Sequence, residues 1–137
     1  MKTLTTQILN SQRKFVEYDI TKEICDTFFG LRTFVHVAVA GRKVGYMAFS
    51  LEKKNIFIHK MINFSIQTDN PLKHIGLLLV EYAFKVSLKK GKNGRIELTA
   101  LDKSPAAFFR LGFRKKNIGS KKNDHLISEL NDQFEIS

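Results

Sequence analysis

The sequence predicts a single mixed α/β (α+β) domain over residues 1–137, and two patterns support this class. Short β-like runs separated by tight turns occupy most of the first half, which is typical of neighbouring antiparallel strands. A long apolar helix and another strand follow, and such a crossover places two strands parallel. The 137 residues, of which 43% are hydrophobic, suffice for one domain with a full core.

Two elements are predicted before residue 32. Residues 15–20 alternate weakly between apolar and polar side chains, which indicates a strand. Residues 21–31 are predicted to be helical because Ile24, Phe28 and Leu31 form an apolar stripe at spacings of four and three. The single cysteine of the chain excludes an internal disulfide framework.

Three strands are predicted between residues 34 and 68. Residues 34–40 and 43–50 flank a turn at Gly41, which indicates an antiparallel hairpin. Residues 56–68 form one long β-like run whose alternation changes phase after Ile58. A change of phase within a strand is what a β-bulge produces, so a bulge is expected there.

The second half is predicted to begin with a long helix that packs on the sheet, and its later strands are predicted to complete the sheet. This helix is apolar almost all round, which indicates burial. The tail from Asn131 is expected to fray. In chain order the predicted elements are a helix at 76–90, a strand at 95–101, a short helix at 104–111, and strands at 113–118 and 125–130.

The segment 69–79 joins the long strand to the long helix and carries the first candidate site. Lys73 stands three positions before Gly76, at the start of the helix. The first helical turn presents unpaired N–H groups and the positive end of the helix dipole, which favour an anion. These residues therefore indicate a phosphate or pyrophosphate cradle. An ordinary strand–loop–helix connection, with Asn70 as cap and Pro71 in the first turn, explains the same residues.

Two segments resemble motifs of the GNAT superfamily of N-acetyltransferases, which use acetyl-CoA. Residues 73–78, Lys-His-Ile-Gly-Leu-Leu, are similar to the family's pyrophosphate loop, Arg/Gln-x-x-Gly-x-Gly/Ala. Residues 104–113, Ser-Pro-Ala-Ala-Phe-Phe-Arg-Leu-Gly-Phe, are similar to its Ala-x-x-Phe-Tyr-x-x-Leu-Gly-Phe segment. The resemblance implies a GNAT-like mixed central sheet with antiparallel N-terminal strands, a splayed parallel pair in the centre, and flanking helices.

The resemblance also implies acetyl-CoA as co-substrate, without a metal, and direct acetyl transfer to an amine in a ternary complex. In such a fold the pantetheine arm pairs with the backbone of the long strand, and the pyrophosphate binds the helix N-terminus. The residues so implied in cofactor binding are Ile66, Gln67, Thr68, Lys73, His74, Ile75, Gly76, Leu77, Leu78 and Phe108.

Neither of the family's usual proton-transfer groups stands at its position in this sequence. Phe108 occupies the place of the tyrosine that protonates the leaving thiolate, and Lys60 falls near the usual carboxylate base. The candidate catalytic residues are therefore His59, as a base poised near pH 7, and Ser104, as a proton donor. An ordinary strand histidine and a helix cap are the structural alternatives for these two residues.

The net charge of +10 attracts polyanions, although basic clusters at turns are also typical of solvated loop tips. Three functions remain open. They are an N-acyltransferase, a GNAT-like module that binds CoA, RNA or an acidic partner without turnover, and an acyltransferase for an amine on an RNA-bound substrate. No signal peptide, membrane span or membrane partner is expected, so a cytoplasmic protein is predicted. The amine acceptor and homodimer formation stay open.

Overall fold

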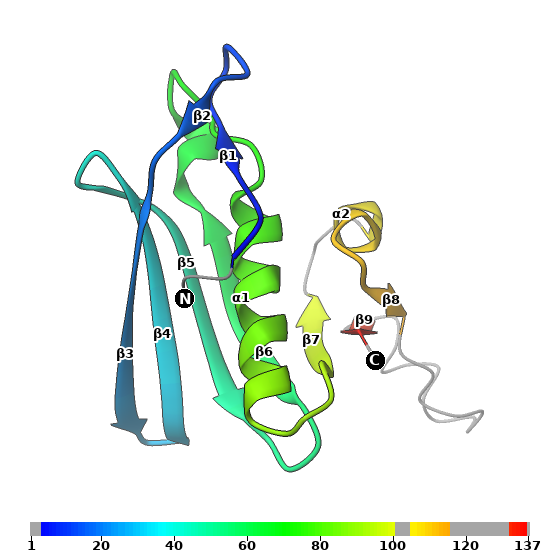
Figure 1. The fold of residues 1–137 in the computed structure, drawn as a ribbon. Coiled ribbons are helices and arrows are strands. Elements are labelled where there is room, and N and C mark those ends of the chain that lie inside the picture. The colour runs from blue at the N-terminus through cyan, green and yellow to red at the C-terminus, as the bar shows by residue number, and fades with distance from the viewer. Residues whose placement is uncertain (1–3, 101–104, 116–131, 137) are drawn as a thin grey trace.

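The structure is a computed structural model that describes residues 4–100, 105–115 and 132–136. Its elements are β1 (Ile8–Leu9), β2 (Phe15–Val16), β3 (Asp19–Thr27), β4 (Gly30–Val39), β5 (Arg42–Leu51), β6 (Ile56–Asn63), the 3-10 helix η1 (Phe64–Gln67), α1 (Ile75–Lys89), β7 (Ile96–Ala100), α2 (Pro105–Arg110), β8 (Arg114–Lys115) and β9 (Asp132–Ile136). A seven-stranded sheet in the order β3-β4-β5-β6-β7-β9-β8 forms the body (Figure 1). This mixed architecture confirms the predicted fold class.

Strands β3 to β6 form the antiparallel half of the sheet, as predicted for the hairpin of β4 and β5. The turn between these two strands lies at Ala40 and Gly41, which both have positive φ, 51° and 78°. Two consecutive positive φ values give the type I′ turn that matches the twist of a tight hairpin. The expected first strand at residues 15–20 is interrupted, because β2 pairs with β1 in a separate sheet and β3 begins only at Asp19.

The predicted helix at residues 21–31 is wrong, because this segment forms β3, a turn and the start of β4. Ile24 and Phe28, the first two residues of the apolar stripe, are four positions apart, and this spacing also fits the two-residue period of a strand. Thr27 closes the turn, since its hydroxyl donates to the Gly30 carbonyl at 2.7 Å and accepts from the Phe29 N–H at 3.2 Å. Uninterrupted pairing of β3 with β4 then satisfies the backbone better than an isolated helix would.

The central parallel pair separates along its length. Within the described residues, β6 and β7 pair only through Ile56–Ile58 and Ile96–Leu98, although β6 continues to Asn63. The parallel direction and the splay are both as predicted. We call the space between the two strands beyond this pairing the slot.

The C-terminal tail contradicts the expectation that it frays. Residues 132–136 form β9, which inserts between β7 and β8 and pairs with β7 along its full length. Phe134 is fully buried, and burial of an aromatic side chain stabilises such a terminal strand. The predicted strand at residues 125–130 lies outside the described residues.

Helix α1 confirms the predicted long helix and packs on β5 and β6. Its first residue lies unusually close to the sheet, because a Cβ added to Gly45 would stand 2.7 Å from Cγ2 of Ile75. Gly45 therefore sets where the N-terminus of α1 rests. None of the helices in the described ranges combines the length and apolarity that crossing a bilayer requires.

The N-terminal segment is fastened along α1. The Glu81 carboxylate accepts hydrogen bonds from the Thr5 hydroxyl at 2.6 Å and from the Thr6 N–H at 2.8 Å. The Thr5 N–H also donates to both carboxylate oxygens, at 2.9 and 3.0 Å. Burial alone would raise the pKa of Glu81, but these hydrogen bonds outweigh it and lower the pKa to about 2. The segment then continues to β1, where Leu9 and Lys73 exchange backbone hydrogen bonds at 2.8 and 3.2 Å.

Candidate active site

The predicted β-bulge lies at His59. Phe49 of β5 pairs with Ile58, and the preceding Ala48 pairs with Lys60, so His59 is the extra residue of β6. The pairing of β6 with β7 also stops at Ile58. The bulge and the beginning of the slot therefore coincide at one residue.

His59 lies on the sheet face opposite α1. Ile56 and Ile58 are buried against the core, and the alternation of a strand turns Phe57 to the other face. The His59 ring lies 5.0 Å from the Phe57 ring, centroid to centroid, and contacts Ser50, which pairs with Phe57. His59 therefore lies where the pairing of β6 with β7 ends, on the face away from α1.

A hydrogen-bonded chain of three side chains orients the His59 ring. Nε2 of His59 lies 2.8 Å from Oγ of Ser50, and this hydroxyl donates to Oε2 of Glu52 at 3.0 Å. An ionised carboxylate only accepts, and a hydroxyl has one proton to donate. Nε2 must therefore carry the proton that it donates to Ser50. In the neutral ring, Nδ1 then holds the free lone pair.

The surroundings of His59 favour its neutral form. Burial lowers the pKa of His59 below its usual value of 6.5, the positive charge of Arg32 lowers it further, and the negative charge of Glu52 partly opposes both. A base with a lowered pKa remains unprotonated to a lower pH. The arrangement can accept a proton at Nδ1 near neutral pH.

The second part of the site is the N-terminus of α1. His74 is its N-cap residue, with φ of 78°, and its side chain makes no capping hydrogen bond within the described part of the chain. The Nδ1–H of His74 instead donates to the Gln7 carbonyl at 3.0 Å, since a carbonyl only accepts. The first N–H groups of α1 have no helical partner, so this end offers donors to an anion.

The neighbouring predicted residues contribute mainly through their backbones. The side chains of Ile75 and Leu78 are buried in the core, so the bulky side chain of Leu78 turns inward. A Cβ on Gly76 would meet the methyl carbons of Leu111 at 3.6 and 3.7 Å, an ordinary contact. The side chains of Lys73 and Leu77 are exposed.

The structure corrects the strand segment expected to bind the pantetheine arm. Ile66 and Gln67 belong to η1, and Thr68 follows as its C-cap residue, so the three are not in an extended strand. The chain leaves the strand here because Asn63 caps η1, with Oδ1 accepting from the Ser65 N–H at 2.9 Å. The extended backbone beside the slot is instead residues 59–63 of β6.

Phe108 lies in an aromatic cluster at the end of α2. Its half-buried ring stacks on Phe134 with centroids 5.1 Å apart and meets Phe113 edge to face at 6.3 Å. The neighbouring Phe109 is more exposed and contacts Phe134 at 5.8 Å. Ser104, the other predicted catalytic residue, lies outside the described residues.

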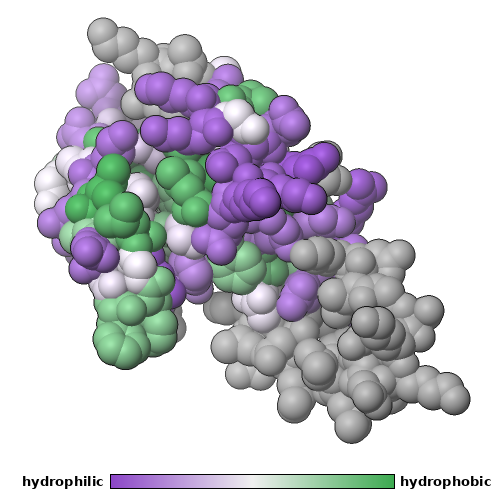
Figure 2. Space-filling model, turned by 90° about the horizontal axis from the view of Figure 1, so that it is seen from below, coloured by the Kyte–Doolittle hydropathy of each residue, from purple (hydrophilic) through white to green (hydrophobic). Residues whose placement is uncertain are grey.

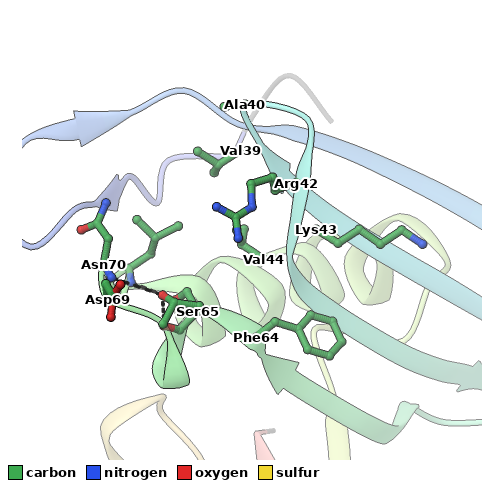
Figure 3. A pocket seen from close by; sticks show the side chains of 11 residues that line it. Val39, Ala40, Arg42, Lys43, Val44, Phe64, Ser65, Asp69 and Asn70 are labelled. Carbon is green, nitrogen blue, oxygen red and sulfur yellow. Dashed lines mark hydrogen bonds between the residues drawn. The ribbon is translucent and has the colours of Figure 1, made fainter.

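A separate hollow of about 540 Å³ lies on the other side of the end of β6 (Figure 3). The Arg42 side chain reaches into it, whereas Lys43 points away. Asp69 and Asn70 line its far side. It borders β5 rather than β7, so it is distinct from the slot.

Sequence reasoning proposed His59 as a base but did not predict its hydrogen-bond partners Ser50 and Glu52. These two residues stand two positions apart at the end of β5 and just after it, whereas their contact with His59 depends on the register across the bulge. No group of three His, Cys, Asp or Glu in the described ranges is arranged to hold a metal ion.

No family model and no curated protein matches this sequence, whereas solved structures do. An acyl-CoA N-acyltransferase from Pseudomonas aeruginosa matches with a TM-score of 0.54 and 14% identity, over 79% of this chain and 70% of that one. The PaiA N-acetyltransferase from Thermoplasma acidophilum, in complex with coenzyme A, matches with a TM-score of 0.54 and 16% identity, over 76% of this chain and 59% of that one.

A putative streptothricin acetyltransferase from Bacillus anthracis, in complex with acetyl coenzyme A, matches with a TM-score of 0.56 and 9% identity, over 99% of this chain and 90% of that one. Further matches are acetyltransferases of the GNAT family. At these identities the likeness shows a shared fold.

Proposed function

We propose that this chain, which has the GNAT fold, is an acyl-CoA-dependent N-acyltransferase that transfers an acetyl group to an amine. One observation carries the proposal. The slot between β6 and β7 begins at the bulge residue His59. The hydrogen bonds of Ser50 and Glu52 keep the proton of this ring on Nε2, so that Nδ1 is unprotonated. A base therefore stands where a cofactor arm in the slot would end.

The residues present fit acetyl-CoA. The backbone of residues 59–63 borders the slot and can pair with an extended pantetheine arm as an added strand would. The N-terminus of α1 offers N–H groups and a positive dipole to the pyrophosphate. The exposed side chain of Lys73 stands beside it and adds a positive charge.

The proposed chemistry needs few groups from the protein. Acetyl-CoA supplies a thioester, whose carbonyl carbon forms the new bond to the amine nitrogen as the carbon–sulfur bond breaks. Nδ1 of His59 accepts the proton that the amine loses. Since Phe108 has no hydroxyl, the thiolate takes its proton from solvent. Positioning of the two substrates then supplies most of the rate enhancement.

A GNAT-like module that binds CoA without turnover is the second candidate. The specific observation in its favour is Phe108, whose ring is packed against Phe134 where an acid would otherwise stand. Loss of a general acid typically costs about two to four powers of ten in rate.

Thermal unfolding with and without acetyl-CoA tests the shared part of both candidates. Acetyl-CoA at about a hundred times its dissociation constant should stabilise the fold by roughly 2.7 kcal/mol, and an unchanged unfolding temperature at saturating concentrations would exclude both. Release of free thiol over a panel of amines then separates the two. An N-acyltransferase releases thiol in proportion to acylated amine and loses most of this activity as His59→Ala, whereas the binding module releases none.

A further inference from the structure

The end of the sheet that carries the β3–β4 turn exposes an aromatic tip. Phe28 and Phe29 occupy this turn and are 96% and 77% exposed. Their rings meet edge to face with centroids 5.2 Å apart, and the Arg32 guanidinium lies 5.3 Å from the Phe29 ring centre. Nothing in the described core requires these two rings at this position.

The aromatic tip is part of a larger exposed apolar surface. On β3 and β4, next to the turn, Ile24 and Leu31 are also mostly exposed, and the partly exposed Leu51 ends β5 at the same end of the sheet. Seen from this end, the molecule shows a hydrophobic protrusion on the side of β3 and β4 (Figure 2). Exposed apolar surface of this extent marks a contact site more often than a plain surface.

A lysine cluster stands at the same end. The chain direction places the β3–β4 turn, the β5–β6 turn and the C-terminus of α1 at one end of the fold (Figure 1). The side chain of Lys92 donates to the Lys53 carbonyl at 3.2 Å, which ties the last two of these together. The members of the lysine cluster are Lys53, Lys54, Lys89, Lys90 and Lys92. Figure 2 shows the hydrophilic atoms of this area beside the hydrophobic protrusion.

We propose that this end of the protein binds an anionic lipid surface, with the aromatic tip inserted among the headgroups and the lysine cluster paired with lipid phosphates. Charge complementarity selects the partner, because clustered lysines near a bilayer attract anionic lipids. Shape points the same way. A projecting pair of rings needs a matching pocket on a protein, whereas a fluid interface accepts it without one, and aromatic rings prefer the headgroup level.

Nucleic acid fits this surface less well. Base stacking on a strand needs aromatic rings interleaved with cations along a groove. Here the rings stand together at one projecting turn, and the lysines lie on other turns.

Vesicle binding tests the proposal on the full chain. The protein should co-sediment with vesicles of equal parts phosphatidylcholine and phosphatidylglycerol, and not with phosphatidylcholine alone. Binding should weaken steeply with added salt. Each lysine of the cluster changed to alanine should weaken partitioning about 5-fold, whereas Lys43→Ala at the opposite end of β5 is the matched control and should not.

The aromatic tip is tested with a fluorescent reporter. The chain contains no Trp, so Phe29→Trp gives a single indole whose emission should shift to the blue when anionic vesicles are added. Phe15→Trp is the control, since Phe15 is similarly exposed, at 73%, near the other end of the fold. The double change Phe28→Ser and Phe29→Ser should abolish vesicle binding while leaving the circular dichroism spectrum and the melting temperature unchanged.

Three results would overturn the proposal. One is absence of co-sedimentation at low salt. Another is equal blue shifts for both reporters. The third is that the parent protein does not bind vesicles, while the double change lowers either its sedimentation coefficient or its affinity for RNA. A lowered sedimentation coefficient would show that a second copy of the chain occupies this end, and a lowered RNA affinity would show that an RNA does.

Discussion

Oγ of Ser50 lies 2.8 Å from Nε2 of His59 and donates its own hydrogen bond to the Glu52 carboxylate. This short relay crosses from the end of β5 to the bulge of β6, and it leaves Nδ1 of His59 as the atom that can take a proton. The charges of Arg32 and Glu52 shift the pKa of His59 in opposite directions.

These charges predict how the pH dependence of the proposed transfer responds to mutation. Because Arg32 lowers the pKa of His59 and Glu52 raises it, Arg32→Gln should move the acidic limb of kcat/KM to higher pH and Glu52→Gln to lower pH. The pH–rate profiles of the two variants and of the parent protein measure this. If the acidic limb moved in the same direction in both variants, a group other than His59 would be titrating.

Ser50→Ala should release the ring from a single tautomer. Nitrogen chemical shifts of His59 should change from the Nε2–H form to a mixture of both forms, because the acceptor for Nε2–H is gone. NMR of protein labelled at histidine measures this without any substrate. His36 serves as the internal reference, since its ring contacts Tyr46 and not Ser50. An unchanged His59 signal would contradict the relay.

Gly76→Glu should remove acetyl-CoA binding while keeping the fold. The added Cβ meets Leu111 at ordinary distance, whereas a carboxylate about 5 Å from a phosphate opposes it by about 3 kcal/mol, or roughly 100-fold in affinity. Calorimetric titration of the folded variant measures the loss. The control is Leu88→Glu, which adds the same charge at an exposed position near the other end of α1. Equal affinity of the two variants would place the cradle elsewhere.

Phe108→Tyr should raise the rate of acetyl transfer. The new hydroxyl supplies the acid that the proposed site lacks, and such a group is typically worth about two to four powers of ten in rate. Single-turnover thiol release measures the rate. Phe109→Tyr, with the same change on the adjacent, more exposed ring, should leave it unaltered. A rate that rises in neither variant would mean that Phe108 does not face the leaving group.

Glu81→Gln should loosen the N-terminal segment and lower stability by about 1–2 kcal/mol, because charge-assisted hydrogen bonds from Thr5 and Thr6 are weakened. Folding lowers the pKa of Glu81 from 4.5 to about 2. The stabilisation is therefore complete above about pH 4.5 and is lost as the pH falls toward 2. Denaturant unfolding across this range should show a smaller loss in the variant than in the parent protein, and parallel curves would contradict the assignment.

The local patterns of the sequence predicted the elements whose period is unambiguous. The phase change after Ile58 located the bulge to within a residue, and the continuous apolar run located α1. The stripe that began at Ile24 failed because its spacing suits both a helix and a strand, and only the pairing with β4 decides between them. The strand β9 was missed because Phe134 finds its place between strands that are distant in sequence.

The candidate site divides in the same way. An anion site at Lys73 and Gly76, on either side of the start of α1, could be proposed from the sequence because a helix start is local. The relay from Glu52 to His59 could not, since it depends on which residues of β5 and β6 oppose each other after the bulge. The strand predicted to continue through Ile66, Gln67 and Thr68 ends early for a local reason, which is the side-chain cap from Asn63.

The backbone hydrogen bonds between Leu9 and Lys73 tie the first residues to the loop before α1, which is part of the proposed anion-binding site. A shortened protein that began at β3 would retain all seven strands of the large sheet and all of α1, although not Ile8, whose side chain is fully buried in the core. It would nevertheless lose the strand that holds the loop before α1 in place, together with the carbonyl of Gln7 that holds His74. Domain boundaries drawn around the sheet alone would thus remove part of the core together with the residues that hold the proposed anion-binding loop.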